Sequence, residues 1–262
     1  MEKRFICTRH EEIVYGFWPR DAEALAGDAL RIHAEKGWAW LRLPLYPLTE
    51  GRILGAKIRE GAAGAWAGEP ISKDGRELPP ALFRGADADL ILSTIRLLSE
   101  RPTPISLDLK GPLSVLETLT PSLRVYQKLR KDDPYLQELS CGLRDWAVSC
   151  IDAGVSLISF ADPLATLDLI GEKNFLAHYW PLLKGLLQGI FSARPQVNIH
   201  LCGKLSQDLL DLGLLGKEVL PLEHPYPLDQ ALLQRKGLLS GLACLNGPSI
   251  PQTEIVKLIL SE

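Results

Sequence analysis

Several features that mark common classes of protein are missing from this sequence. Lys and Arg number 29 against 32 Asp and Glu, so the formal net charge of -3 shows none of the basic excess that nucleic acids and anionic membranes attract. No apolar run approaches the roughly 18 residues of a membrane span, because Lys184 and Gln188 interrupt the longest one. The charged start, residues 1–5, leads into no apolar segment of signal-peptide type. We therefore expect a cytoplasmic protein that binds neither nucleic acid nor membrane.

Disulfides and common cofactor fingerprints are also lacking. The five cysteines are an odd number in a chain without an export signal, which disfavours disulfides and favours metal or catalytic use. No G-x-G-x-x-G follows a predicted strand, and no H-E-x-x-H supplies the general base of a zinc hydrolase. Any redox or carrier group is therefore expected to come from a partner.

Short apolar, β-branched runs alternate with helical patterns, which is typical of βα units around a parallel sheet. Strands are predicted at residues 39–45, 104–109, 155–161, 197–202, 219–223 and 239–244, with a further candidate at 5–8. Helices are predicted at 21–36, 87–100, 135–153, 172–192 (with a kink or break at Pro181), 206–212, 228–236 and 252–260. The Gly-rich stretch 51–80 predicts an irregular hairpin. With no internal repeat or linker, the sequence predicts one α/β domain over residues 1–262. Six or seven strands fall short of eight, so it is a TIM-like (β/α)8 barrel or one that lacks a βα unit.

The segment Val197-Asn198-Ile199-His200-Leu201-Cys202-Gly203 carries the main chemical signal. Residues two apart on a strand share a face, so His200 and Cys202 point the same way at the carboxyl end, where barrel enzymes keep their chemistry. The next two predicted strands end in Glu223 and Cys244. Imidazole, thiolate and carboxylate are the ligands that zinc takes in tetrahedral sites. These four residues therefore predict a zinc site at the barrel mouth, although His200 and Cys202 alone would also fit buried core residues.

The same residues belong to a wider resemblance to the uroporphyrinogen decarboxylase superfamily, and within it to the methylcobamide:coenzyme M methyltransferases and their corrinoid-dependent relatives. The specific parts are the strand His200-Leu201-Cys202-Gly203 and the turn Ala161-Asp162-Pro163. The supporting parts are Trp18-Pro19-Arg20-Asp21-Ala22-Glu23, Leu43-Pro44-Leu45, Leu48-Thr49-Glu50, Gly111-Pro112, Ile158-Ser159-Phe160, Leu164-Ala165 and Ile250-Pro251-Gln252-Thr253.

The resemblance implies a zinc-dependent methyltransferase that works with a corrinoid, that is cobalamin-binding, protein. The zinc would be held by His200, Cys202 and Cys244, with Glu223 as an exchangeable fourth ligand that leaves when substrate binds. The chain has no room for a cobalamin domain, so the corrinoid would sit on a partner that caps the barrel mouth. The methyl donor, the acceptor and the direction of transfer stay open, with a small thiol slightly favoured as the acceptor.

Two further carboxylates are candidates for substrate binding. Asp162 follows a predicted strand and precedes Pro163, so it either orients the substrate or simply starts a turn. Glu50 follows the first barrel strand and either faces the mouth or is a solvated loop carboxylate.

The sequence also departs from the family pattern. Cys244 follows Glu223 too closely for the βα unit that family members place between them, and Leu245-Asn246-Gly247-Pro248 differs from the expected Gly-rich loop. Two alternatives to the methyltransferase therefore stay open. One is a lyase of the decarboxylase type, which the lack of its N-terminal arginine motif disfavours. The other is a shortened, non-catalytic paralogue that binds a corrinoid protein. Zinc content separates the methyltransferase from both.

Overall fold

The parallel strands of the main sheet follow one another along the chain. The computed structural model describes residues 18–45, 48–61, 64–245 and 251–260, so the strand predicted at 5–8 lies outside the described residues. In this part of the chain a seven-stranded sheet runs in the order β1-β4-β5-β6-β8-β9-β7. The first five strands pair in parallel. They are β1 (Leu41–Arg42), β4 (Ile105–Lys110), β5 (Val155–Ala161), β6 (Asn198–Leu201) and β8 (Leu239–Ser240), and each overlaps a predicted strand.

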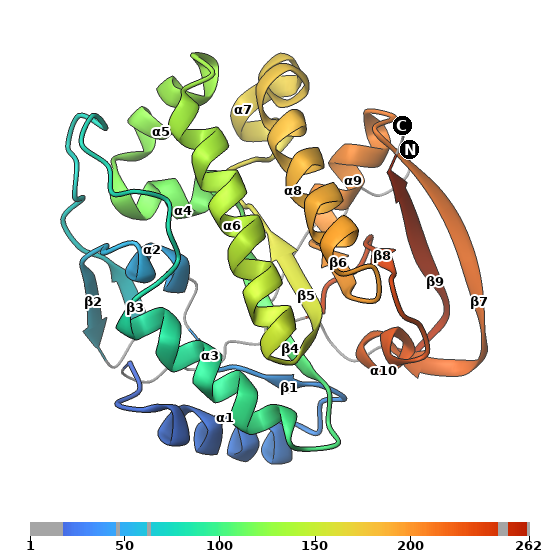
Figure 1. Cartoon of the computed structure of the whole chain (residues 1–262). Helices are drawn as coiled ribbons and strands as arrows, with labels where there is room; N and C mark the ends of the chain where they lie inside the picture. The colour runs from blue at the N-terminus through green and yellow to red at the C-terminus, as the bar shows by residue number, and fades with distance from the viewer. Residues whose placement is uncertain (1–17, 46–47, 62–63, 246–250, 261–262) are drawn as a thin grey trace.

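Four long helices cover the outer face of these strands. Helix α1 (Ala22–Lys36) packs on α3 (Ala86–Ser99), α3 packs on α6 (Pro134–Ala153), and α6 packs on α8 (Trp180–Ala193). Figure 1 shows α3, α6 and α8 crossing in front of the strands. Helices on one face only are the arrangement of a barrel, since a doubly wound sheet carries them on both. The inner face carries both polar side chains and the apolar Leu157, and β1 and β7 are the edges of the sheet within the described residues.

Helix α6 illustrates how local sequence sets an element. The Asp133 side chain accepts a hydrogen bond from the Tyr135 backbone N–H, and Pro134 occupies the first helical position, where its missing N–H has no cost. Gly154, with a φ of 134°, ends the helix. Between these ends one stripe of side chains is buried: Leu136, Leu139, Leu143, Trp146, Ala147 and Cys150.

The helix predicted at 172–192 is interrupted, as Pro181 indicated. The chain forms α7 (Leu167–Asn174), a π-helical turn (Phe175–Tyr179) and then α8, with Pro181 in the first turn of α8. Gly171 has a φ of 73° inside α7, which breaks regular helix there as well. The helices predicted at 206–212 and 228–236 correspond to α9 (Gly203–Asp211) and α10 (Leu228–Leu233).

Five shorter elements lie between β1 and α6. The predicted hairpin is formed by β2 (Ile58–Gly61) and β3 (Gly64–Ala67), which pair antiparallel. The sequence patterns did not predict α2 (Thr49–Ile53), α4 (Pro112–Leu119) or α5 (Ser122–Arg130). These helices are too short to show a clear 3.6-residue period, although Pro112 at the start of α4 is a typical helix-initiation signal.

At the far edge of the sheet, one predicted element is of the wrong type and another is longer than predicted. The segment predicted as a helix, 252–260, is the strand β9 (Pro251–Leu260). Its buried residues Ile255 and Leu258 are three apart, which imitates a helical face, but its β-branched residues favour a strand once a partner is present. That partner is β7 (Leu215–Pro227), which pairs antiparallel with β9. The strand predicted to end at Glu223 therefore continues through that residue to Pro227.

The core lies mainly between the parallel strands and the outer helices. A smaller cluster joins the β7–β9 ribbon and α10 to the sheet, through Trp40, Leu157, Ala231, Leu232, Leu238 and Ile255. Among the described residues, no helix has the length and apolarity needed to cross a membrane.

Candidate functional site

A polar row crosses the inner face of the sheet. Asp108 of β4 is in register with Ser159 of β5, Ser159 with His200 of β6, and His200 with Ser240 of β8. Because side chains alternate along a strand, Lys110 and Cys202, each two residues further on, extend this face toward the carboxyl ends. The residues between them, such as Leu109 and Leu201, are fully buried on the opposite face. The sheet therefore aligns its polar side chains at one end of the inner face.

His200 is almost fully buried in this row, with 2% of its surface exposed. Its Nε2 lies 3.2 Å from the Ala243 carbonyl oxygen and its Nδ1 lies 2.9 Å from the Ser240 hydroxyl. A carbonyl only accepts, so Nε2 carries the proton and Nδ1 accepts from Ser240. Burial lowers the pKa of His200 to about 4, and the Ala243 contact offsets this only in part. The ring is therefore neutral at pH 7, which is the form that binds metals.

Cys202 stands at the junction between β6 and α9. Its backbone N–H continues the sheet by donating to the Phe160 carbonyl at 2.9 Å, and its own carbonyl accepts from Ser206 at 2.9 Å to begin the helix. A glycine at 203 follows directly, as the sequence predicted for the end of this strand. Cys202 is thus held at the carboxyl end of the sheet by backbone bonds on both sides.

Three of the four predicted ligands line one cavity of about 350 Å³. His200, Cys202 and Cys244 all line it, with Asp162 in the same wall. The other lining residues are Asp108, Lys110, Ser159, Phe160, Ala161, Pro163, Thr166, Lys204, Leu205 and Leu245. A second cavity of about 150 Å³ shares Ser159, Cys244 and Leu245 with the first and extends to Trp38 and Arg42. The predicted site is therefore a hollow at the carboxyl ends of β5, β6 and β8.

Glu223 is not brought to this cavity. Its side chain is exposed on β7, within the segment 222–225 that interrupts the regular pairing with β9. In the arrangement of the described residues, no three His, Cys, Asp or Glu side chains are grouped closely enough to hold a metal ion. In this arrangement the Nε2 atom of His200 is turned toward the Ala243 carbonyl and is not available to a metal ion.

Asp162 connects the carboxyl ends of β4 and β5. Its carboxylate accepts from the backbone N–H groups of Leu113 and Ser114, at 3.1 and 3.0 Å, and from the Ser114 hydroxyl at 2.6 Å. It thereby caps the first turn of α4 from a neighbouring strand. Burial raises the pKa of Asp162, against the lowering effect of these donors. A side chain at Gly111 would overlap the Asp162 carboxylate, which explains the glycine of the Gly111-Pro112 pair.

Glu50 is buried rather than solvated. It is 3% exposed at the start of α2, and its Oε1 accepts from the Lys110 backbone N–H at 3.2 Å. Burial raises the pKa of Glu50 to about 7. The solvated-loop alternative is therefore wrong. Glu50 contacts the strand that supplies Asp108 and Lys110 to the cavity.

Comparisons with known proteins agree with the resemblance seen in the motifs. The chain is 26% identical over 223 residues to the methylcobamide:CoM methyltransferase MtaA of Methanosarcina barkeri (strain Fusaro / DSM 804), covering 79% of this chain and 65% of the relative. It is 23% identical over 217 residues to the methylcobamide:CoM methyltransferase MtbA of Methanosarcina acetivorans, covering 76% and 63%. The chain is homologous to the methylcobamide:CoM methyltransferases. It spans less than two thirds of the length of these two relatives, and no protein-family model matches it.

A solved structure, a methyltransferase from Methanosarcina mazei, matches with a TM-score of 0.62 at 23% identity, covering 76% of this chain and 63% of the other. This likeness shows a shared fold. It agrees with the mostly parallel sheet and the helices on its outer face.

Several cavity residues of this methyltransferase homologue were missed by the sequence predictions. Asp108, Lys110 and Ser159 come from the inner faces of β4 and β5, and Ser240 contacts His200 from β8. A signal for β4 was present, because Ile105-Ser106-Leu107-Asp108-Leu109-Lys110 alternates apolar and polar residues without a break. Ser240 had no such signal, since its importance comes only from its register with His200.

Proposed function

We propose that this chain is a methyltransferase that moves a methyl group between a corrinoid on a partner protein and a small thiol or methyl donor, with zinc held by His200, Cys202 and Cys244. The observation that carries the proposal is the single cavity that these three residues line, at the carboxyl ends of the strands. The homology to methylcobamide:CoM methyltransferases supplies the type of reaction.

The three side chains fit zinc in their chemistry. One neutral imidazole and two thiols are the nitrogen and sulfur donors of common zinc sites, and a three-ligand site leaves one position for substrate. Zinc, when bound, would deprotonate a substrate thiol and so make it a nucleophile toward the methyl group. A sulfur-rich ligand set suits this better than it suits water activation.

Metal binding requires a local rearrangement within this chain. His200 must release the Ala243 carbonyl to expose Nε2, and Nδ1 must then donate to the Ser240 hydroxyl. Ala243 directly precedes Cys244, so one shift of the segment after β8 would free the imidazole and reposition the thiol together. We expect this segment to move when zinc binds.

The remaining cavity surface would hold the small substrate. About 350 Å³ is at the lower end of the volumes that enclose a drug-sized molecule, and it is too small for a corrinoid with its nucleotide tail. Lys110 and Asp108 offer one charge of each sign beside the proposed ligands. The corrinoid is therefore proposed to approach from outside on its own protein. Asp162 would act by fixing the wall of the cavity.

The direct experiment mixes the zinc-loaded protein with methylcobalamin and a panel of small thiols, and follows loss of the methyl–cobalt absorbance. The reverse assay uses reduced corrinoid protein with methoxylated aromatics or methylamines. We expect zinc-dependent turnover in wild type, loss of turnover in Cys202→Ala, and full turnover in Cys141→Ala. Cys141 is the matched control because it lies on α6, away from the cavity. No zinc-dependent change in either direction, with an authentic corrinoid protein present, would contradict the proposal and favour the non-catalytic alternative.

A further inference from the structure

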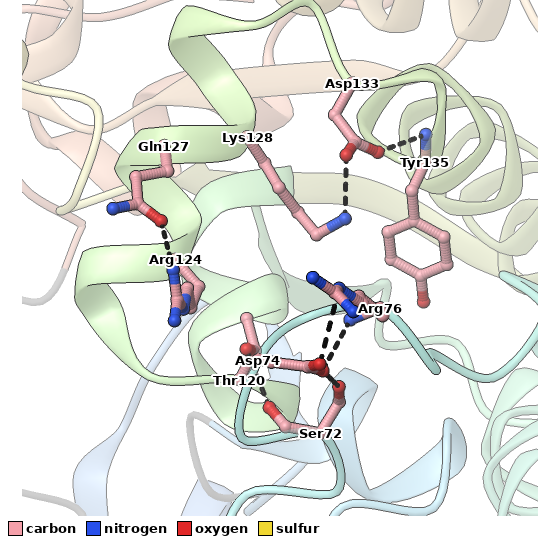
Figure 2. Close-up of polar contacts among 9 residues, drawn as sticks. All are labelled: Ser72, Asp74, Arg76, Thr120, Arg124, Gln127, Lys128, Asp133 and Tyr135. Carbon is pink, nitrogen blue, oxygen red and sulfur yellow. Dashed lines mark hydrogen bonds and ion pairs between the residues drawn. The ribbon is translucent and has the colours of Figure 1, made fainter.

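A further cleft lies between α5, the start of α6 and the loop that follows β3. It is distinct from the proposed zinc cavity. Its volume is about 600 Å³. The loop contributes Asp74, Gly75, Arg76 and Leu78. Helix α5 contributes Arg124, Gln127 and Lys128, and the start of α6 contributes Tyr135 and Glu138. Figure 2 shows the Lys128 ammonium and the Arg76 guanidinium directed into the space between α5 and the loop.

The charges in this cleft leave a surplus of unneutralised cations. Its basic residues are Arg76, Arg124, Lys128 and Lys131, and its acidic residues are Asp74, Asp133 and Glu138.

The three carboxylates are already engaged in the walls. Asp133 pairs with Lys128 at 2.8 Å and caps α6. Asp74 accepts from the Ser72 hydroxyl and the Arg76 backbone, and Glu138 accepts from the Ala81 backbone at 2.9 Å.

Two of the cations have no carboxylate to neutralise them. Arg124 donates to the Gln127 side-chain oxygen at 2.6 Å, a neutral acceptor. Within the described residues no ion pair involves Arg124 or Lys131. A guanidinium and an ammonium at one cleft, without acidic partners, are the donors that an anionic ligand requires.

The walls of the cleft are fixed in place. The Thr120 hydroxyl, fully buried, donates to the Ser72 carbonyl at 2.8 Å, and the Ser72 N–H donates to the Leu119 carbonyl at 3.1 Å. These bonds hold the loop against the junction of α4 and α5. Gly75 has a φ of 74°, and a Cβ there would lie 3.1 Å from Cε of Lys128. The Lys128 ammonium also lies 5.9 Å from the centre of the Tyr135 ring. The cationic groups are therefore presented by a preformed surface.

We propose that this cleft binds a small molecule through a phosphate or diphosphate group. The planar Arg124 guanidinium suits a bidentate contact with phosphate oxygens, and Lys131 adds a second positive charge without an acidic partner; Arg76 is already paired with Asp74 at 3.5 Å. The cleft is large enough to enclose a phosphorylated molecule of moderate size. The site shares none of the residues proposed to bind zinc, so it is separate from the methyl-transfer proposal.

The test is calorimetric titration of the full chain with inorganic pyrophosphate at an ionic strength of about 0.15 M, where weak surface attraction is largely screened. We expect saturable binding to one site. Arg124→Gln should weaken it about tenfold, the loss expected for one charge-assisted hydrogen bond. The matched control is Arg130→Gln, which removes the same charge from the same helix at an exposed position outside the cleft. This variant should bind pyrophosphate within about twofold of wild type.

Titrations with inorganic phosphate and a nucleoside monophosphate identify the group that is recognised. Tighter binding of pyrophosphate than of either supports a diphosphate ligand, whereas equal binding of all three supports a single phosphate. Absence of saturable binding overturns the proposal, as does an equal loss in Arg130→Gln. Both variants should keep the zinc content and the circular dichroism spectrum of wild type. A failed methyl-transfer assay therefore leaves this test unaffected.

Discussion

The parallel strand β6 and the edge strand β7 differ in burial and in how well their structure could be predicted from the sequence. Every residue of β6 is buried. One face of the strand packs against the outer helices, and the other face carries part of the polar row. In β7, by contrast, Leu215 is the buried residue and most others are exposed. His200 belongs to the first region and Glu223 to the second. The sequence pattern of a buried strand is enough to predict the environment of its residues. The environment of a residue in the β7–β9 ribbon depends also on which strand pairs with it.

The largest expected effect contrasts truncations in the two regions. Leu201 of β6 is fully buried, so Leu201→Ala should lower the free energy of unfolding by about 3 kcal/mol through lost contacts and a cavity. Val219 of β7 is 49% exposed, so Val219→Ala should change it by less than about 0.5 kcal/mol. Urea unfolding followed by circular dichroism measures both. Equal losses would show that the ribbon packs as tightly as the parallel strands.

A second test uses the pH dependence of stability that the buried carboxyl group of Glu50 produces. Glu50 has a folded pKa of about 7, above its ordinary value of 4.5, because burial disfavours its charged form. The unfolded chain therefore loses this proton first as the pH rises. The stability contribution of protonated Glu50 is present below about pH 4.5 and is lost as the pH rises to about 7, by roughly 2–3 kcal/mol.

The Glu50→Gln variant should remove this decline, so its stability relative to wild type should increase from pH 5 to pH 8. Unfolding midpoints measured across this pH range provide the comparison. A Glu50→Gln profile parallel to that of wild type would mean that Glu50 is not desolvated.

A third test concerns the contact that orients His200. Ser240 lies 2.9 Å from Nδ1, and outer contacts of this kind typically change metal affinity by about 10–100-fold. We expect Ser240→Ala to weaken zinc binding by that factor in a competitive chelator titration. Ser149→Ala, on α6, should have no effect, because its hydroxyl bonds only within that helix. Unchanged affinity in Ser240→Ala would argue against Nε2 as the zinc-binding atom.

The smallest expected effect is that of Glu223→Gln on zinc content. The sequence predicted Glu223 as an exchangeable fourth ligand, but its side chain is exposed on β7, outside the cavity. We therefore expect this variant to bind the same amount of zinc as wild type. A clear drop would show that β7 rearranges to bring Glu223 to the metal.

Sequence patterns predicted the buried half of the fold well and the ribbon poorly. Strand β5 was predicted at its observed bounds, because a mainly apolar, β-branched run between Gly154 and the turn Asp162-Pro163 has few other solutions. Alternation along the predicted strand also put His200 and Cys202 on one face, and both line the cavity. Such patterns could not predict which distant segments pair with one another. The β7–β9 register, the Ser240–His200 contact and the capping of α4 by Asp162 all depend on such pairing.

The central claim is that His200, Cys202 and Cys244 hold one zinc ion, and metal analysis of purified protein tests it most directly. We predict one zinc per chain in wild type and in Cys141→Ala, and almost none in Cys202→Ala, because two remaining ligands rarely retain zinc. Cys202→Ala should still show the circular dichroism spectrum of wild type, which separates loss of metal from loss of fold. Full zinc content in Cys202→Ala, or no zinc in the wild-type protein after growth and purification with zinc, would contradict the account.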